Sequence, residues 1–197
     1  RPIDGDSIYN GAVDNASGTA CLLAIAESFK KEAPAKRSIV FIAVTGEEQG
    51  LLGSAYYSEH PIYDPEKTVA NINMDALSSP GRMKDLTITG FGHSEMDEYA
   101  AAAAKKQGRY VIPDPNKEKG YFFRSDHFNF AKIGIPALYA SGTYEGFDYS
   151  VEQIKEMTDH YETYRYHQPS GLKLSNEDYF PKWYDGSEFK AARKRDY

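Results

Sequence analysis

The sequence predicts an α/β protein, in which a β-sheet carries helices on its faces. Segments with helical patterns alternate along the chain with short β-type segments. Residues 38–44 form a continuous apolar, β-branched run, which is typical of a strand buried on both faces. Acidic residues follow two of the predicted strands, at the carboxyl ends where open α/β sheets bind ligands.

The composition indicates one domain spanning residues 1–197, with an ordinary share of apolar (41%) and charged (26%) residues for a soluble globular protein. The net charge of −6 argues against a nucleic-acid partner, and the basic triplet at 193–195 is interpreted as a solvated end. No apolar run approaches the ~20 residues of a membrane span. The chain begins at Arg1, so we interpret it as a cropped or processed piece of a longer polypeptide.

The first predicted element is a helix over residues 16–31. Asn15 or Ser17 can cap its start, and Pro34 follows its end. The single cysteine, Cys21, lies in the apolar part of this helix and is expected to be a buried, inert thiol. One cysteine also excludes an intrachain disulfide and a cysteine-based zinc site.

Three strands and one short helix are predicted between residues 38 and 89. Residues 38–44 are expected to form a central strand, followed by a short helix over 51–59 that Pro61 stops. Residues 68–74 form a second central strand, and residues 85–89 form a third with clearer alternation.

The second half of the chain continues the alternation. An alanine-rich helix is predicted over 94–107, ended by Gly108, and a short helical turn over 128–132. Residues 136–140 have the pattern of a further strand, and residues 151–164 that of a polar helix.

Four acidic residues lie at positions that favour metal binding or proton transfer. Glu47 and Glu48 directly follow the apolar run 38–44, Asp75 ends the next predicted strand, and Asp14 precedes the first helix. Carboxylates at the end of a buried strand are costly unless a cation or a reaction uses them. Neighbouring side chains point in different directions, so one glutamate of the pair can bind a metal while the other transfers protons.

A hydrolytic metal site needs ligands of this kind, together with a base for the attacking water. The proposed ligands for Zn²⁺ are Asp14, Glu48, Asp75 and His167. Glu47 is then free to act as the base. Each residue also has a structural interpretation: the glutamates can favour a helix N-terminus, Asp14 and Asp75 can cap turns or loops, and His167 can lie on the surface.

The segment Ser125-Asp126-His127 contains the residue types of a serine triad. Triad members are rarely adjacent, because neighbouring side chains cannot all face one point. We therefore do not expect a serine hydrolase.

Five ordered blocks of the sequence resemble the M28 family of zinc peptidases, from about Asp6 to Ser170. The blocks are GAVDNASG (11–18), TGEEQGLLGS (45–54), NINMD (71–75), RSDHF with GIPA (124–128 and 134–137) and YHQP (166–169). The resemblance implies a three-layer α/β/α sandwich around a mixed, mostly parallel sheet. This agrees with the α/β class that the element pattern predicts.

The resemblance also implies roles for single residues. Asp14 would bridge two zinc ions, Glu48 and His167 would complete one zinc site, and Asp75 would serve the other. Glu47 would be the general base, taking a proton from the attacking water and passing it to the leaving amine.

Two further positions follow from the same resemblance. Asp126 would lie near the site and orient a ligand or the substrate. His127 is not expected to be a ligand.

The sequence departs from the family pattern in two places. The family's first zinc ligand, a histidine in a His-x-Asp segment, is absent upstream of Asp14, and Asp4 and Asp6 do not replace it. Ser170 also runs directly into Gly171, where family members continue with a linker and a long helix. We therefore expect one zinc peptidase domain that is incomplete at its N-terminus and between residues 170 and 171. Two zinc ions are expected if the upstream histidine is present.

The expected activity is that of a zinc-dependent exopeptidase, in particular an aminopeptidase acting on peptides with a free N-terminus. A pocket rich in carboxylates suits a protonated α-amine. Aromatic residues that could line a side-chain pocket, or pack in the core, are Tyr121, Phe122, Phe123, Tyr139 and Tyr144. The resemblance also implies a secreted or periplasmic protein.

Two alternatives remain open from the sequence. One is a glutaminyl cyclase with a single zinc ion, although the blocks at 14–18 and 47–54 are more similar to those of the peptidases. The other is a non-catalytic binding domain of peptidase-like fold, which only the missing histidine supports.

Overall fold

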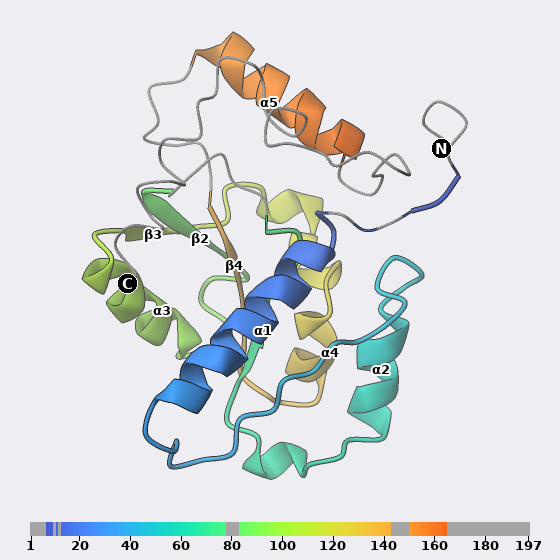
Figure 1. Ribbon diagram of the computed structural model, residues 1–197, viewed down its shortest axis with the longest axis vertical. Coiled ribbons are helices and arrows are strands. Elements are labelled where there is room, and N and C mark those ends of the chain that lie inside the picture. The colour runs from blue at the N-terminus through green and yellow to red at the C-terminus, as the bar shows by residue number, and fades with distance from the viewer. Residues whose placement is uncertain (1–6, 10, 12, 78–82, 143–149, 165–197) are drawn as a thin grey trace. The chain divides into compact units, whose positions relative to one another are not determined.

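The computed structural model describes residues 7–9, 11, 13–77, 83–142 and 150–164 (Figure 1). The chain divides into two compact units. The first unit comprises the described residues within Arg1–Ala24, Asp75–Met83 and Tyr144–Tyr197, and the second comprises those within Ile25–Met74 and Lys84–Thr143.

The second unit contains a four-stranded mixed sheet with the order β1-β4-β2-β3. Its strands are β1 (Asn71–Asn73), β2 (Asp85–Thr89), β3 (Tyr110–Pro113) and β4 (Ala137–Ser141). β1 pairs with β4, and β2 with β3, in parallel, whereas β2 and β4 are antiparallel. The mixed sheet with its helices confirms the predicted α/β class.

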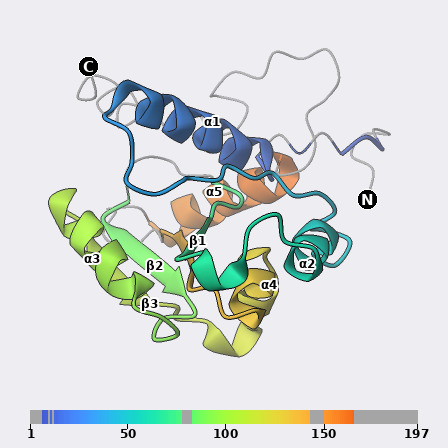
Figure 2. The ribbon, with the colours of Figure 1, turned by 90° about the horizontal axis from the view of Figure 1, so that it is seen from below.

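Three helices of this unit pack on the sheet or on each other. α3 (Met96–Lys106) contacts β2 and β3, α4 (His127–Lys132) contacts β1 and β4, and α2 (Leu52–Glu59) lies against α4 (Figure 2). The buried apolar side chains Ile88, Ala100, Ala104, Phe130 and Ile135 form the core. Short 3₁₀ turns complete the unit: η1 (Pro65–Lys67), η2 (Lys117–Lys119) and η3 (Tyr121–Phe123).

α1 (Ala16–Lys31) begins in the first unit, and its start shows which of the two candidate residues is the cap. The Asn15 Oδ1 atom accepts a hydrogen bond from the Gly18 backbone N–H at 3.0 Å. The Ser17 hydroxyl instead donates to the Val13 carbonyl at 2.6 Å. Asn15 is therefore the N-cap, because it satisfies a backbone N–H of the first turn that has no partner within the helix.

Local sequence patterns predicted most helices well. α1 and β2 have the predicted bounds, as does α5 (Val151–Tyr164). α2 and α4 differ from the prediction by one residue at their start, β4 by one residue at each end, and α3 by two at its start and one at its end. None of the described helices is long and apolar enough to cross a membrane.

The strand predicted for residues 38–44 is wrong. These residues pair with none of the four strands, and Ile39, Val40 and Phe41 are exposed although apolar. A β-strand requires hydrogen bonds to a neighbouring chain segment, and hydrophobicity alone cannot supply them. Phe41 makes a local ring contact instead, with Phe29 at 6.4 Å between centroids.

Three other predictions differ from the structure: the length of one strand, the absence of another and the burial of Cys21. The strand predicted over 68–74 is reduced to β1, which lies at the sheet edge, and Val69 and Ile72 are 61% and 62% exposed. β3 was missed because it has four residues and ends in proline. Cys21 is half-buried rather than buried, because it lies towards the exposed part of α1.

Candidate metal and catalytic site

The Glu47–Glu48 pair lies in a tight turn before α2. The Glu47 carbonyl accepts a hydrogen bond from the Leu51 N–H at 2.9 Å, and the Thr45 carbonyl accepts one from the Gly53 N–H at 2.8 Å. These bonds tie the start of α2 back onto the segment that carries the glutamates. The turn is therefore a defined structure, not a loose loop.

Two glycines of this turn are required by its geometry. A Cβ atom on Gly53 would lie 2.5 Å from the Thr45 backbone nitrogen, which no side chain could tolerate without a shift. Gly46 has a φ of +68°, in the left-handed region that favours glycine. The pattern of glycines around the glutamates thus serves the close approach of α2 to the turn.

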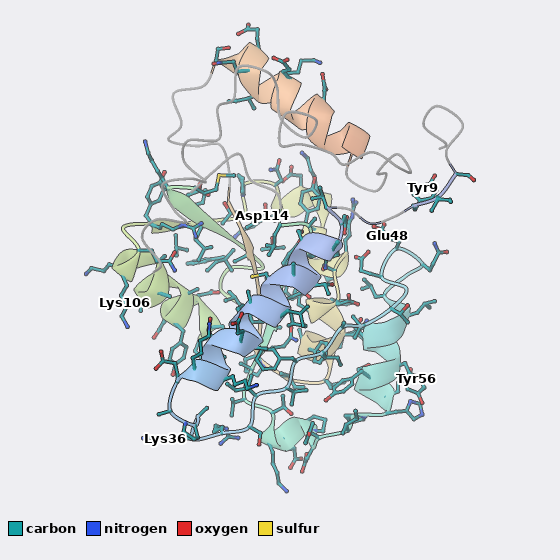
Figure 3. The ribbon with its side chains drawn as sticks, in the orientation of Figure 1. Tyr9, Lys36, Glu48, Tyr56, Lys106 and Asp114 are labelled. Carbon is teal, nitrogen blue, oxygen red and sulfur yellow. The ribbon has the colours of Figure 1, made fainter. Side chains whose placement is uncertain are left out.

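The two glutamates lie in different environments. Glu47 is half-buried, whereas Glu48 is exposed in the turn before α2 (Figure 3). The separate roles of the two carboxylates stay a prediction.

In the first unit, one hydrogen bond joins the segments that carry Asp14 and Asp75. The Asn15 Oδ1 atom, which caps α1, also accepts from the Ala76 N–H at 3.2 Å. Asp14 is buried and Asp75 is half-buried. The structure thus brings together two acidic blocks that are about sixty residues apart in the sequence.

Asp126 lies beside the block that contains the glutamates. Its carboxyl group is partly buried near Ser54, the last residue of that block. Burial raises the pKa of Asp126, and the nearby Ser54 hydroxyl partly opposes this rise. The Asp126 Oδ1 atom is buried and makes no hydrogen bond within the part of the chain that the structure describes.

His127 is fully buried between aromatic rings. Its ring lies 5.0 Å from that of Phe122 and 4.9 Å from that of Tyr139, between centroids. Neither ring nitrogen has a hydrogen-bond partner, and burial lowers the pKa of His127 to about 4. The neutral imidazole packs like an aromatic side chain. It makes no bond to Ser125, whose hydroxyl instead accepts from Asn73 at 2.7 Å, so a serine triad is not formed.

Three of the aromatic residues considered for a pocket or the core, Phe122, Phe123 and Tyr139, lie in a cluster of rings. Phe122 stacks on His93, with 4.5 Å between ring centroids, and meets Phe123 edge-on at 5.4 Å. Tyr121 and Phe123 are exposed. His93 was not found from the sequence, because its loop and η3 meet only in the fold. Tyr144 lies outside the described residues.

The proposed ligand set is only partly described. His167 lies outside the described residues. Asp14 and Asp75 belong to the first unit and Glu48 to the second, and each unit is described by itself. Within the described part of the chain, no group of three or more His, Cys, Asp or Glu side chains is gathered as a metal site. The donor chemistry of these residues, carboxylates with one imidazole, nevertheless fits Zn²⁺.

The mixed sheet with its flanking helices places the chain among α/β proteins. Residues 3–176 match the sequence model of Peptidase family M28, so the chain belongs to this family. The earlier resemblance is thereby confirmed.

The chain is similar in sequence to proteins that are named as peptidases. A "Probable zinc metalloprotease" of Pyrenophora tritici-repentis is 28% identical over 177 residues, covering 74% of this chain and 36% of the relative. "Aminopeptidase YwaD" of Bacillus subtilis is 39% identical over 70 residues, which cover 35% of this chain and 15% of YwaD. The chain thus spans little more than a third of the first of these relatives.

Solved structures share the fold. A zinc aminopeptidase from Bacillus subtilis superposes with a TM-score of 0.57 at 22% identity, covering 92% of this chain and 39% of that chain. An aminopeptidase from Aneurinibacillus sp. strain AM-1 gives a TM-score of 0.55 at 26% identity, covering 86% of this chain and 36% of that chain.

Proposed function

We propose that this chain forms the catalytic part of a zinc-dependent exopeptidase, in particular an aminopeptidase that acts on peptides with a free N-terminus. The observation that carries the proposal is the glycine-shaped turn that holds two adjacent glutamates, one half-buried and one exposed. Membership of Peptidase family M28 and the names of the relatives support it.

The ligands in this proposal are Asp14, Glu48, Asp75 and His167. Asp14 would be shared between two zinc sites, with Glu48 and His167 in one and Asp75 in the other. Zinc, when bound, supplies the Lewis acidity that polarises a carbonyl group and makes water a better nucleophile at neutral pH.

Glu47 is the proposed general base. Its carboxylate takes a proton from the attacking water and later gives it to the leaving amine. Partial burial suits this role, because it limits competing hydrogen bonds from solvent. Asp126, which is partly buried near Ser54, is the proposed residue that orients a ligand or the substrate.

The carboxylates also favour a substrate with a protonated α-amine, because opposite charge compensates the loss of its hydration. The exposed rings of Tyr121 and Phe123 could contact an apolar substrate side chain. The negative charge of the carboxylates and the exposed aromatic rings favour a peptide substrate over an acidic substrate or a nucleic acid.

The test uses the purified full-length protein. Its metal content is measured, and a panel of aminoacyl-arylamides is offered before and after chelation. About two zinc ions per chain, with turnover lost on chelation, would support a two-metal aminopeptidase. About one zinc ion without arylamide cleavage would favour the cyclase, and no metal with no turnover would favour the binding domain.

We also propose that the protein acts outside the cytoplasm, as a secreted or periplasmic enzyme. Family resemblance is the support for this proposal. Fractionation of the source cells with an antibody to the chain tests it, and recovery in the cytoplasm alone would contradict it.

A further inference from the structure

A buried polar contact joins α4 to the start of α2, which follows the Glu47–Glu48 turn. The Asn129 side chain, 4% exposed, donates from Nδ2 to the Ser54 Oγ atom at 2.9 Å and to the Leu51 carbonyl at 3.4 Å. Ser54 is fully buried, and its hydroxyl lies 3.2 Å from the same carbonyl. Buried polar groups of this kind are costly to leave without partners, so the contact fixes both helices.

Asn129 bonds Leu51, a residue with a strained backbone at the start of α2. Leu51 has φ 60° and ψ 36°, a left-handed conformation that is unfavourable for a residue other than glycine. Its N–H donates to the Glu47 carbonyl, and its own carbonyl is the acceptor for Asn129. The peptide units of Leu51 therefore link Asn129 to the backbone of the proposed base.

The donors at this point are not equivalent. A serine hydroxyl has one proton, so Ser54 can donate to only one acceptor, and the Leu51 carbonyl lies within its reach. The Asn129 amide has two protons, and it donates to both Ser54 and the Leu51 carbonyl. Asn129 is therefore the donor that can hold Leu51 and Ser54 together.

We propose that Asn129 is a positioning residue for the reaction. Its amide holds the Leu51 carbonyl and the Ser54 hydroxyl, and thereby keeps the Glu47–Glu48 turn in its reactive conformation. Asn129 reaches the reaction only through the backbone of the turn. The kinetic part of this inference rests on the proposed peptidase function, but the structural part does not.

The main variant is Asn129→Leu, which is close in size but cannot donate. In the zinc-loaded full-length protein we expect kcat to fall about 10- to 100-fold with KM within about twofold, because supporting residues around metal sites have effects of this size. The acid limb of the pH–rate profile should also move, since the limb reports the proposed base. A loss of thermal stability with kcat per folded molecule unchanged would overturn the proposal.

Two readouts do not depend on turnover. Amide hydrogen exchange in residues 45–53 should become faster in Asn129→Leu, and zinc affinity measured by competition with a chromophoric chelator should fall about 10- to 100-fold. If the wild type has no peptidase activity but both changes occur, the proposed function fails and the positioning role stands. If neither changes, the positioning role is wrong.

The matched control is Ser58→Ala. Ser58 lies one turn further along α2, and its hydroxyl bonds the Ala55 carbonyl at 2.7 Å, with no recorded bond to α4. This variant should leave kcat, exchange and zinc affinity unchanged. If Asn129→Leu does not fold, Ser54→Ala supplies the test, with the same expected directions and smaller effects. Unchanged kinetics and exchange in Ser54→Ala would then contradict the proposal.

Discussion

Glu47 is the residue on which the proposed chemistry depends most directly. Replacement Glu47→Gln keeps the size of the side chain but removes the base, so we expect kcat to fall about 10²- to 10⁴-fold while bound zinc is retained. Kinetics with an arylamide and metal analysis of the same sample check this. Glu48→Gln is the comparison and should instead lower zinc content. Equal turnover in Glu47→Gln and wild type would contradict the assignment.

His127 makes the stability of the second unit depend on pH. Its pKa is about 4 in the folded protein against 6.5 for an ordinary histidine. The unfolded chain therefore binds the proton more readily, and the stability due to the buried neutral ring is complete above pH 6.5. It is lost as the pH falls from 6.5 to 4, by about 3 kcal/mol.

The measurement compares urea unfolding of the wild type and His127→Phe across this pH range. The variant fills the same aromatic site without a titrating group, so its stability should fall less steeply. The neighbouring Asp126, whose raised pKa gives the opposite slope, is present in both proteins and cancels in the comparison. Parallel curves for the two proteins would show that His127 does not titrate in this way.

At the scale of elements, the approach of α2 to its preceding turn depends on Gly53. Gly53→Ala places a Cβ atom against the Thr45 backbone, so we expect a loss of about 2–3 kcal/mol in unfolding free energy. Gly108→Ala is the control, because Gly108 has φ +71° but open space around it, and should cost about 1 kcal/mol. Equal losses in urea unfolding would mean that the close approach is not limiting.

The start of α1 depends on Asn15, whose Oδ1 atom accepts hydrogen bonds from the backbone N–H groups of Gly18 and Ala76. Asn15→Ala should lower the free energy of unfolding by about 1–2 kcal/mol, because both groups lose their partner. Asn15→Asp keeps an acceptor oxygen and favours the helix N-terminus, so it should retain most of the stability. Chemical denaturation of the metal-free proteins measures both. An aspartate variant as unstable as the alanine variant would argue against capping.

At the scale of the whole molecule, zinc should stabilise the fold if the ligand set is correct. Ligand binding to the native state alone contributes about 4 kcal/mol when free zinc exceeds the dissociation constant a thousandfold. Thermal unfolding of the full-length protein with and without zinc measures this. Asp75→Asn should reduce the gain in Tm, whereas Asp64→Asn, in the exposed turn before η1, should not. A gain that is equal in both variants would place the ion elsewhere.

Much of the fold could be predicted from local patterns. The bounds of α1, β2 and α5 follow from periodicity, capping residues and breakers, which act over a few neighbouring residues. The run 38–44 shows the limit of such patterns. Its composition is that of a buried strand, yet it pairs with none of the four described strands, and Ile39, Val40 and Phe41 are exposed.

Some residues of the candidate site could be proposed from the sequence, and others could not. Glu47, Glu48, Asp14 and Asp75 could be proposed from the sequence, because residue type and position after a strand or before a helix are local properties. Asn129 could not, because it bonds Ser54 across 75 positions of the sequence.

Neighbouring residues and ordered motifs are sufficient to predict the α/β class, most helices and the family to which the chain belongs. The sheet order β1-β4-β2-β3, the edge position of β1, the bond from the Ala76 N–H to Asn15 and the contact between α2 and α4 could be found only in the folded chain. The reason is physical: hydrogen bonds between strands and contacts between helices join distant residues, and their partners exist only once the chain has folded.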